Sequence, residues 1–184
     1  QSGGTASSTR AVSMGGRTPS TFSIDTIRTT EFKSKGNVSD FGNLVVASSY
    51  MNGGGNSTRG IKAGGAAVSP AGAVQDNIEY ITIATLGDAT DFGNLTAASK
   101  EKIGGQMGNT TRAVFAGGKS PGYGNIIEYV TIANTGNATD FGNLTTSRSY
   151  VAQTSSTLRG ITAGGYGPNN NENTIEFITI ASTG

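Results

Sequence analysis

The chain has 184 residues, enough to bury a sizeable core in one domain, and its 13 Lys and Arg nearly balance its 12 Asp and Glu, leaving a net charge of +1. This balance excludes the basic face expected of a nucleic-acid-binding protein, and no apolar run reaches the 18 residues that would indicate membrane insertion. The sequence contains neither Cys nor His, which removes thiol catalysis, zinc–thiolate sites, the usual general base and the commonest transition-metal ligand. We therefore expect no metal and no cofactor.

A unit of about fifty residues repeats along the chain, a period typical of propellers and solenoids. The pentapeptide Asp-Phe-Gly-Asn-Leu stands at 40–44, 91–95 and 140–144. We predict a single all-β domain over 1–184, with repeat units at approximately 1–46, 47–97, 98–148 and 149–184. No segment shows the sustained 3.6-residue apolar period of a helix.

The first unit differs from the others. It reads Ile27-Arg28-Thr29 where later units have Ile-Glu-Tyr or Ile-Glu-Phe. Terminal repeats are often atypical because they cap the array, so we place an end of the array near residue 1. The chain begins at Gln1 without an initiator Met or a signal peptide, and we therefore expect either processing or a longer parent polypeptide.

Each unit is predicted to be an antiparallel meander of four strands. In the last unit the first strand is expected at 149–156, the second at 159–165, and the third at 174–181 after a polar loop at 166–173. In the complete units a fourth strand carries Asp-Phe-Gly-Asn-Leu.

The third strand of a complete unit is apolar on both faces. Ile78, Tyr80 and Ala84 lie on one face, and Ile81 and Ile83 lie on the other. Such a strand is expected where a sheet is stacked between two neighbours. The second strands consist largely of small residues, which suits crowded packing near a central axis.

The order of these signals resembles the kelch repeat. In the last unit it runs Thr146-Ser147-Arg148, then Arg159 to Gly164-Gly165, then Ile175-Glu176-Phe177. The resemblance covers nearly the whole chain and implies a kelch-like β-propeller of four-stranded antiparallel blades, with about four units and the last one incomplete. Kelch units have a fourth-strand Trp, whereas this chain has Phe at that position. A looser resemblance links such arrays to kelch-like proteins of bacteriophages, including cyanophages, and of large viruses.

The last unit stops at Gly184, where the next Asp-Phe-Gly would begin, and so lacks its fourth strand. An unpaired edge of this kind is a template for pairing with another chain. Three explanations remain open. The chain is a fragment of a larger propeller, it is a small imperfect four-bladed ring, or its open edge pairs with a neighbouring subunit in a head-to-tail assembly.

Residues that recur once per unit are predicted to be structural. Arg at the start of each second strand and Glu79, Glu128 or Glu176 in the third predict a repeated cross-strand ion pair, in preference to a ring of binding residues. The Asp of each pentapeptide fits turn capping better than calcium ligation, and the Gly-Gly pairs should end the second strands with backbone angles that other residues avoid. The full structural set is Gly15, Gly16, Gly64, Gly65, Gly117, Gly118, Gly164, Gly165, Asp40, Phe41, Asp91, Phe92, Asp140, Phe141, Arg10, Arg59, Arg112 and Arg159.

The loops between second and third strands differ in length and composition from unit to unit, whereas the turns at the opposite end barely change. They span 17–23, 66–76, 119–125 and 166–173. Function tends to reside in variable loops on a rigid scaffold, and aromatic and amide groups suit sugar or peptide contacts, although unconstrained surface drift would produce the same variation. The candidate binding residues are Phe22, Lys119, Tyr123, Tyr166, Asn169, Asn170 and Asn171.

These observations favour a non-enzymatic protein. The primary hypothesis is a structural or adhesive virion component, such as a tail fibre or surface protein, that forms a homo-oligomer or contacts neighbouring virion subunits and binds a host-surface glycan or protein. Its expected location is the virion or the extracellular space. The alternative is a fragment of a larger kelch-type interaction propeller. The weakest alternative is a glycan-cleaving enzyme that uses a carboxylate pair such as Asp88 and Asp91.

Overall fold

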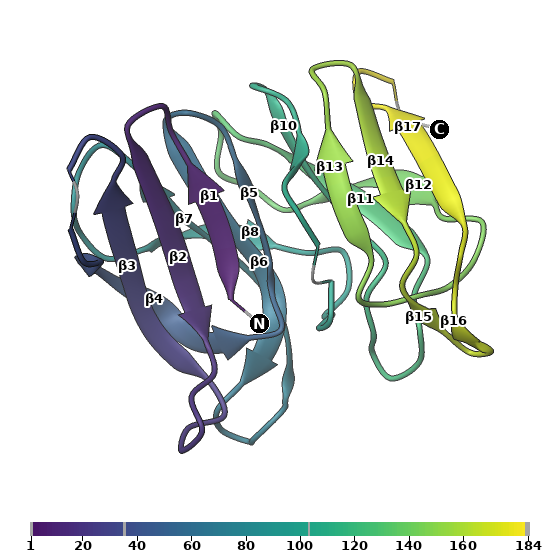
Figure 1. The fold of residues 1–184 in the computed structure, drawn as a ribbon. Helices are drawn as coiled ribbons and strands as arrows, with labels where there is room; N and C mark the ends of the chain where they lie inside the picture. Colours follow the sequence, from purple (N-terminus) through teal and green to yellow (C-terminus); the bar gives the residue numbers. More distant parts are fainter. Residues whose placement is uncertain (1, 35, 103, 183–184) are drawn as a thin grey trace.

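A computed structural model describes residues 2–34, 36–102 and 104–182, which form antiparallel β-structure without a helix (Figure 1). The all-β prediction is confirmed. Within these ranges no helix is present that could cross a membrane. The strands are β1 (Gly3–Ala6), β2 (Arg10–Gly16), β3 (Ile24–Glu31), β4 (Ser39–Ser49), β5 (Asn52–Gly55), β6 (Arg59–Ala67), β7 (Val74–Thr82), β8 (Thr90–Asn94), β9 (Met107–Gly108), β10 (Arg112–Ala116), β11 (Ile126–Thr131), β12 (Thr139–Asn143), β13 (Ala152–Ser155), β14 (Arg159–Ala163), β15 (Tyr166–Gly167), β16 (Asn170–Asn171) and β17 (Ile175–Thr179).

The strand pairing divides the chain into four meanders, which we name units 1 to 4. Unit 1 comprises β1 to β4, unit 2 β5 to β8, unit 3 β9 to β12, and unit 4 β13, β14 and β17. The end of β4 also pairs with β6, so units 1 and 2 form one continuous sheet. The loop predicted at 166–173 contains a small hairpin, β15–β16, that the polar composition concealed.

The four units form an open array, and the described strands do not close into a ring. Figure 1 shows units 1 and 4 on opposite sides, joined through units 2 and 3. The first strands of neighbouring units approach one another, as β1 does β5. The innermost strand is therefore the first one of each unit, and the expectation that the second strand lies nearest the axis was wrong.

The core consists of three hydrophobic clusters, each between two consecutive units. The cluster between units 2 and 3 contains Ile78 and Phe92 from unit 2 with Phe115 and Val130 from unit 3. Ile81, on the other face of β7, and Ile83, directly after it, belong to the cluster between units 1 and 2, whereas Ala84 is exposed. The two-faced burial predicted for the third strand is confirmed, because each unit needs one face for each neighbour.

The glycine pairs lie at or directly after the ends of the second strands, as predicted, except in unit 2, where β6 continues past its pair to Ala67. Gly64 has φ = +59°, and a Cβ there would collide with the carbonyl oxygen of Ser99. An L-residue side chain is disfavoured at this angle and has no room at this position. The prediction that these glycines adopt angles that other residues avoid is confirmed at all four pairs.

The Asp-Phe-Gly-Asn segments are held by the following unit. The backbone N–H of Gly87 donates to the carbonyl oxygen of Phe41 at 2.8 Å, and Gly136 donates to Phe92 at 2.7 Å. The side chains that accept hydrogen bonds here are Asp88, from the N–H of Asn43 at 2.8 Å, and Asn137, from the N–H of Asn94 at 3.0 Å. The polar contacts thus link one unit to the next, and they come from the turn before each pentapeptide rather than from Asp40, Asp91 and Asp140, which are exposed.

The predicted pairing of the second-strand arginines with Glu79, Glu128 and Glu176 was wrong. The register places Arg59 opposite Thr82, whereas Lys62 lies opposite Glu79. The three carboxylates pair instead with Lys62 at 3.5 Å, Lys102 at 3.0 Å and Arg148 at 2.5 Å. Among the residues that the structure describes, a second-strand Arg forms a cross-strand ion pair in unit 1 alone, where Arg10 lies opposite Glu31.

Each of these glutamates also holds the preceding unit. Glu128 accepts hydrogen bonds from the backbone N–H and the hydroxyl of Thr96, at 2.7 and 2.8 Å. Glu79 accepts hydrogen bonds from the backbone N–H groups of Val45 and Val46. Because these donors directly follow a pentapeptide, each carboxylate anchors the segment that comes after Asp-Phe-Gly-Asn-Leu in the preceding unit.

The second-strand arginines contact the following unit, whereas the glutamates contact the preceding one. Arg59 stacks on Tyr80 of its own unit, 4.7 Å from the ring centroid, and its guanidinium donates to the carbonyl oxygen of Ile132 at 2.8 Å. Arg112 does the same with Tyr129 and Ile180. The planar guanidinium combines ring stacking with hydrogen bonding, so these arginines connect one unit to the next through a contact other than the predicted ion pair.

Burial lowers the pKa of Lys62 from 10.5 to about 8, and the Glu79 carboxylate only partly opposes this shift. Between pH 8 and 10.5 the folded protein has released this proton while the unfolded chain retains it, so the contribution of Lys62 to stability rises with pH by up to about 3 kcal/mol. Urea unfolding of the wild type and of Lys62→Met across this range measures the effect. The wild type should gain stability relative to the variant, and parallel pH profiles would contradict the assignment.

Candidate binding face

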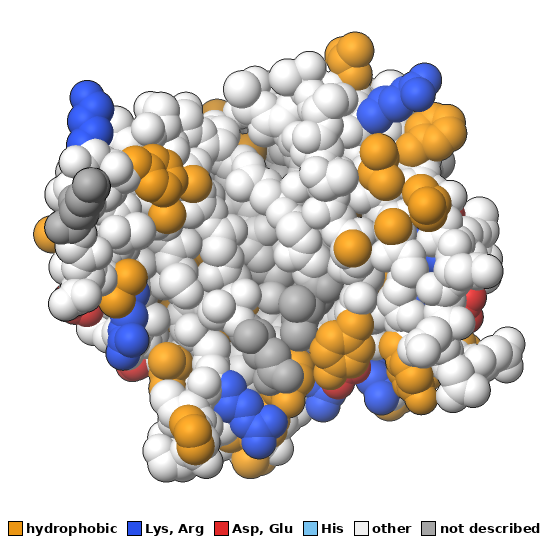
Figure 2. Space-filling model, in the orientation of Figure 1, with side chains coloured by type: hydrophobic (Ala, Val, Ile, Leu, Met, Phe, Trp, Pro, Cys, Tyr) orange, Lys and Arg blue, Asp and Glu red, His pale blue; other side chains and the backbone are white. Residues whose placement is uncertain are grey.

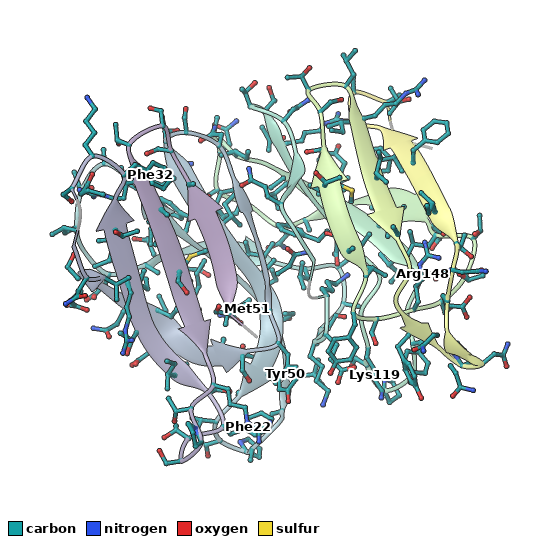
Figure 3. The ribbon with its side chains drawn as sticks, viewed as in Figure 1. Phe22, Phe32, Tyr50, Met51, Lys119 and Arg148 are labelled. Carbon is teal, nitrogen blue, oxygen red and sulfur yellow. The ribbon has the colours of Figure 1, made fainter. Side chains whose placement is uncertain are left out.

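The variable loops place aromatic and charged side chains at one end of the array, which we name the loop face. Figure 3 shows Phe22, Tyr50 and Lys119 along the lower edge of the molecule. Phe22 lies 5.9 Å from Tyr50 between ring centroids, and the Arg17 guanidinium lies 4.9 Å from the Phe22 ring and donates to the Tyr50 hydroxyl at 2.8 Å. These residues form the first group of the loop face.

The second group brings together four of the predicted binding residues. The Lys119 ammonium lies 4.9 Å from the centroid of the Tyr123 ring, which meets the Tyr166 ring at 5.8 Å in an edge-on arrangement. The Tyr166 hydroxyl is 3.3 Å from the Asn170 side-chain oxygen. Asn169, Asn170 and Asn171 are exposed at the β15–β16 hairpin. The structure therefore gathers the predicted residues on one face, with Phe22 in a separate group.

A backbone ladder spans units 2 to 4 at this face. The N–H of Glu101 donates to the carbonyl oxygen of Tyr50 at 2.8 Å, and the N–H of Tyr150 donates to that of Glu101 at 3.0 Å. All three residues have left-handed φ angles, of 56° for Tyr50, 60° for Glu101 and 54° for Tyr150. Non-glycine residues rarely adopt this conformation, and it occurs preferentially at binding and active sites.

The ladder also adjoins the second aromatic group, because Lys100 pairs with Lys119 and Ser149 pairs with Tyr166. Partial burial, and then the adjacent Glu101 carboxylate, raise the pKa of Tyr150 to about 12. Tyr50 and Tyr123 reinforce the shift. The Tyr150 hydroxyl therefore remains a neutral hydrogen-bond donor throughout the physiological pH range. The face thus offers ring surfaces, hydroxyls, amides and both signs of charge.

Tyr50, Glu101 and Tyr150 were missed by the sequence reasoning. Ser-Tyr followed by an apolar residue occurs at 49–51 and again at 149–151, just before the first strand of a unit. This recurrence could have identified the two tyrosines. Their convergence with Glu101 depends on how the units pack, and no local pattern encodes it.

The opposite end of the array holds a pocket of about 530 Å³, lined by the turns that follow the four first strands. Two asparagine side chains of the lining, Asn56 and Asn109, connect neighbouring turns. The Asn56 amide donates to the carbonyl oxygen of Thr110 at 2.9 Å, and its oxygen accepts from the backbone N–H of Arg59. Asn109 similarly donates to Thr157. The two asparagines of this pocket therefore tie its turns to one another.

One member of the carboxylate pair considered for glycan cleavage, Asp88, takes part in a contact between units, and the other, Asp91, is exposed. Asp88 accepts a hydrogen bond from the backbone N–H of Asn43 and so joins two units. Within the described ranges, His, Cys, Asp and Glu do not gather in a group that could hold a metal ion.

Comparison with known proteins adds no assignment. No protein-family model matches the chain. No curated protein matches it either.

Proposed function

We propose that this protein is a non-enzymatic structural and adhesive component of a phage particle, built on a kelch-like propeller architecture. It assembles with neighbouring subunits and presents its loop face to a host-surface glycan or a partner protein, on the virion or outside the cell. The observation that carries the proposal is the joining of two aromatic groups by a ladder of left-handed residues at the loop face.

The chemistry of the face favours a sugar as the ligand. Tyr123 and Tyr166 provide ring surface for the apolar face of a pyranose, while the Asn170 amide and Lys119 ammonium provide hydrogen bonds. Tyrosine combines a large contact area with a low loss of side-chain entropy. Each of these groups reaches solvent at least in part.

A glycan array followed by calorimetry with the best oligosaccharide tests the proposal. We expect Tyr123→Ala with Tyr166→Ala to weaken binding at least tenfold, because each lost stacking contact is worth about 1 kcal/mol or more. Leu158→Ala is the matched control, since its 70% exposed side chain lies at the opposite end. Unchanged binding by the double variant would remove this site from consideration.

The alternative of a larger interaction propeller is favoured by the exposure of Ile175 and Phe177, whose counterparts in unit 3 pack against unit 4. Native mass spectrometry of material from its source separates the two functions. Regular multimers of an 18.6 kDa chain support the virion component, and a single heavier polypeptide supports the interaction propeller.

A further inference from the structure

Each aromatic group of the loop face holds a cation against one of its rings. The Arg17 guanidinium lies 4.9 Å from the centroid of the Phe22 ring. The Lys119 ammonium lies 4.9 Å from the centroid of the Tyr123 ring. Figure 2 shows Lys and Arg side chains beside hydrophobic ones along the lower edge of the molecule. A positive charge therefore stands next to a ring on which a sugar could stack in both groups.

These two cations keep hydrogen-bond donors for a ligand. The ion pairs within the described ranges hold four other cations, and neither Arg17 nor Lys119 takes part in one. Arg17 is exposed and donates to the Tyr50 hydroxyl, and Lys119 is partly exposed. Because a guanidinium and an ammonium each carry several N–H groups, these contacts leave donors that an anionic ligand can use.

The carboxylate of the ladder is engaged with hydroxyl groups of the protein. Glu101 accepts a hydrogen bond from the Ser149 hydroxyl at 3.4 Å. It also lies beside the Tyr150 hydroxyl, where it contributes to the raised pKa of that group. Its neighbour in the chain, Lys100, adds a partly exposed third cation. The ladder region therefore offers a ligand positive charge together with hydroxyl groups.

The ladder makes the two aromatic groups one continuous surface. Tyr50 belongs to the first group and accepts the hydrogen bond of Glu101, which in turn accepts that of Tyr150. Tyr150 is 43% exposed, so its ring and hydroxyl can also contact a ligand. At about 4.8 Å between hydrogen-bonded segments, the ladder spans roughly 10 Å. A ligand that contacts both groups must therefore be a chain of sugars and not a single one.

We propose that the loop face binds an acidic oligosaccharide, one whose sugars carry carboxylate or sulfate groups, across both aromatic groups at once. Its sugar rings stack on Phe22, Tyr123 and Tyr166, and its anionic groups pair with Arg17 and Lys119. Hydrogen bonds between charged groups are stronger than those between neutral groups, so the charge of the glycan determines which glycans bind. The inference rests on the adhesive part of the proposed function and names the class of glycan.

An array of neutral, carboxylated and sulfated oligosaccharides tests the proposal, followed by calorimetry with the best acidic one and its methyl-esterified or desulfated derivative. We expect the acidic form to bind at least tenfold more tightly than its neutral derivative. Raising NaCl from about 50 mM to about 500 mM should weaken binding of the acidic form several-fold, because salt screens exposed charges. The preferred anion follows from which acidic series binds more tightly.

Two double variants of equal net charge locate the contact. Arg17→Gln with Lys119→Gln should weaken binding of the acidic oligosaccharide at least tenfold, because both charged contacts are lost. Arg28→Gln with Lys33→Gln is the matched control. It removes two exposed positive charges from β3 and the turn that follows it, and it should leave the affinity within about twofold of the wild type.

Three results would overturn the inference. These are tighter binding of neutral than of acidic glycans, an affinity that does not change with salt, and equal affinities of the two double variants. The first leaves the adhesive function standing, so failure of the inference is distinguishable from failure of that function. An array on which no glycan binds would contradict the adhesive function itself, and the inference with it. Since the salt series uses the wild type, a variant that fails to fold does not prevent the test.

Discussion

Replacing Glu128 by Gln is expected to lower the free energy of unfolding by about 3–5 kcal/mol, because it leaves the ammonium of Lys102 buried without its counter-charge. Glu128 is 1% exposed and Lys102 is 2% exposed, and their charged atoms are 3.0 Å apart. Burial lowers the pKa of Lys102, which the Glu128 carboxylate opposes. The substitution also weakens the two charge-assisted hydrogen bonds to Thr96. Urea unfolding at neutral pH measures the loss.

The exposed pair of unit 1 is the matched control. Glu31 is 42% exposed where it meets Arg10, and Glu31→Gln should cost less than about 1 kcal/mol, since solvent screens such a pair. The double variant Lys102→Met, Glu128→Leu should recover much of the loss, because it removes both buried charges. Equal losses in the two single Glu→Gln variants would show that burial does not determine the strength of these contacts.

The substitution Gly93→Ala is expected to destabilise the protein by about 3 kcal/mol or more, through backbone strain and steric overlap together. Gly93 has φ = +144°, and a Cβ there would collide with the carbonyl oxygen of Gly136 in the next unit. The clash would separate the two units where Gly136 donates to Phe92 and Ala138 donates to Asn94. Differential scanning calorimetry should show a lower Tm.

Gly122→Ala provides the control for this experiment. Gly122 lies in a loop, and a Cβ there would meet no atom within 4 Å. Its substitution should leave Tm within a few degrees of the wild type, because it adds a methyl group to open space. A Tm for Gly93→Ala equal to that of Gly122→Ala would contradict the close approach between units.

Local patterns anticipated the elements of the fold but not their contacts. The alternation of Ile78, Tyr80, Ile81 and Ile83 predicted a strand buried on both faces, and it packs so. The cation that pairs with each glutamate could not be predicted, because it comes from β6 in unit 2 and from segments before the first strands of units 3 and 4. Strand register and the packing between units determine these partners. The arginines that recur in every second strand led to the wrong prediction, because they do not lie opposite the glutamates.

The candidate binding face likewise contains some residues that the sequence identified and others that it did not. The variable composition of the loops identified Tyr123, Tyr166 and Lys119, which do come together. Tyr50, Glu101 and Tyr150 lie roughly one unit apart in the chain and converge only because successive units repeat around a common axis. Their left-handed backbone is imposed by that packing, since neither Tyr nor Glu favours it.

By itself, the sequence determined that the chain is built from repeated antiparallel meanders, because strand periodicity, glycine placement and the recurring pentapeptide are local properties of the chain. Only the tertiary structure decided which charges are buried together and which residues of different loops come into contact. Those contacts depend on register and on the stacking of one unit against the next. Residues about fifty positions apart become neighbours because strand register and the packing of one sheet against the next place them together. No single segment of the sequence specifies these contacts.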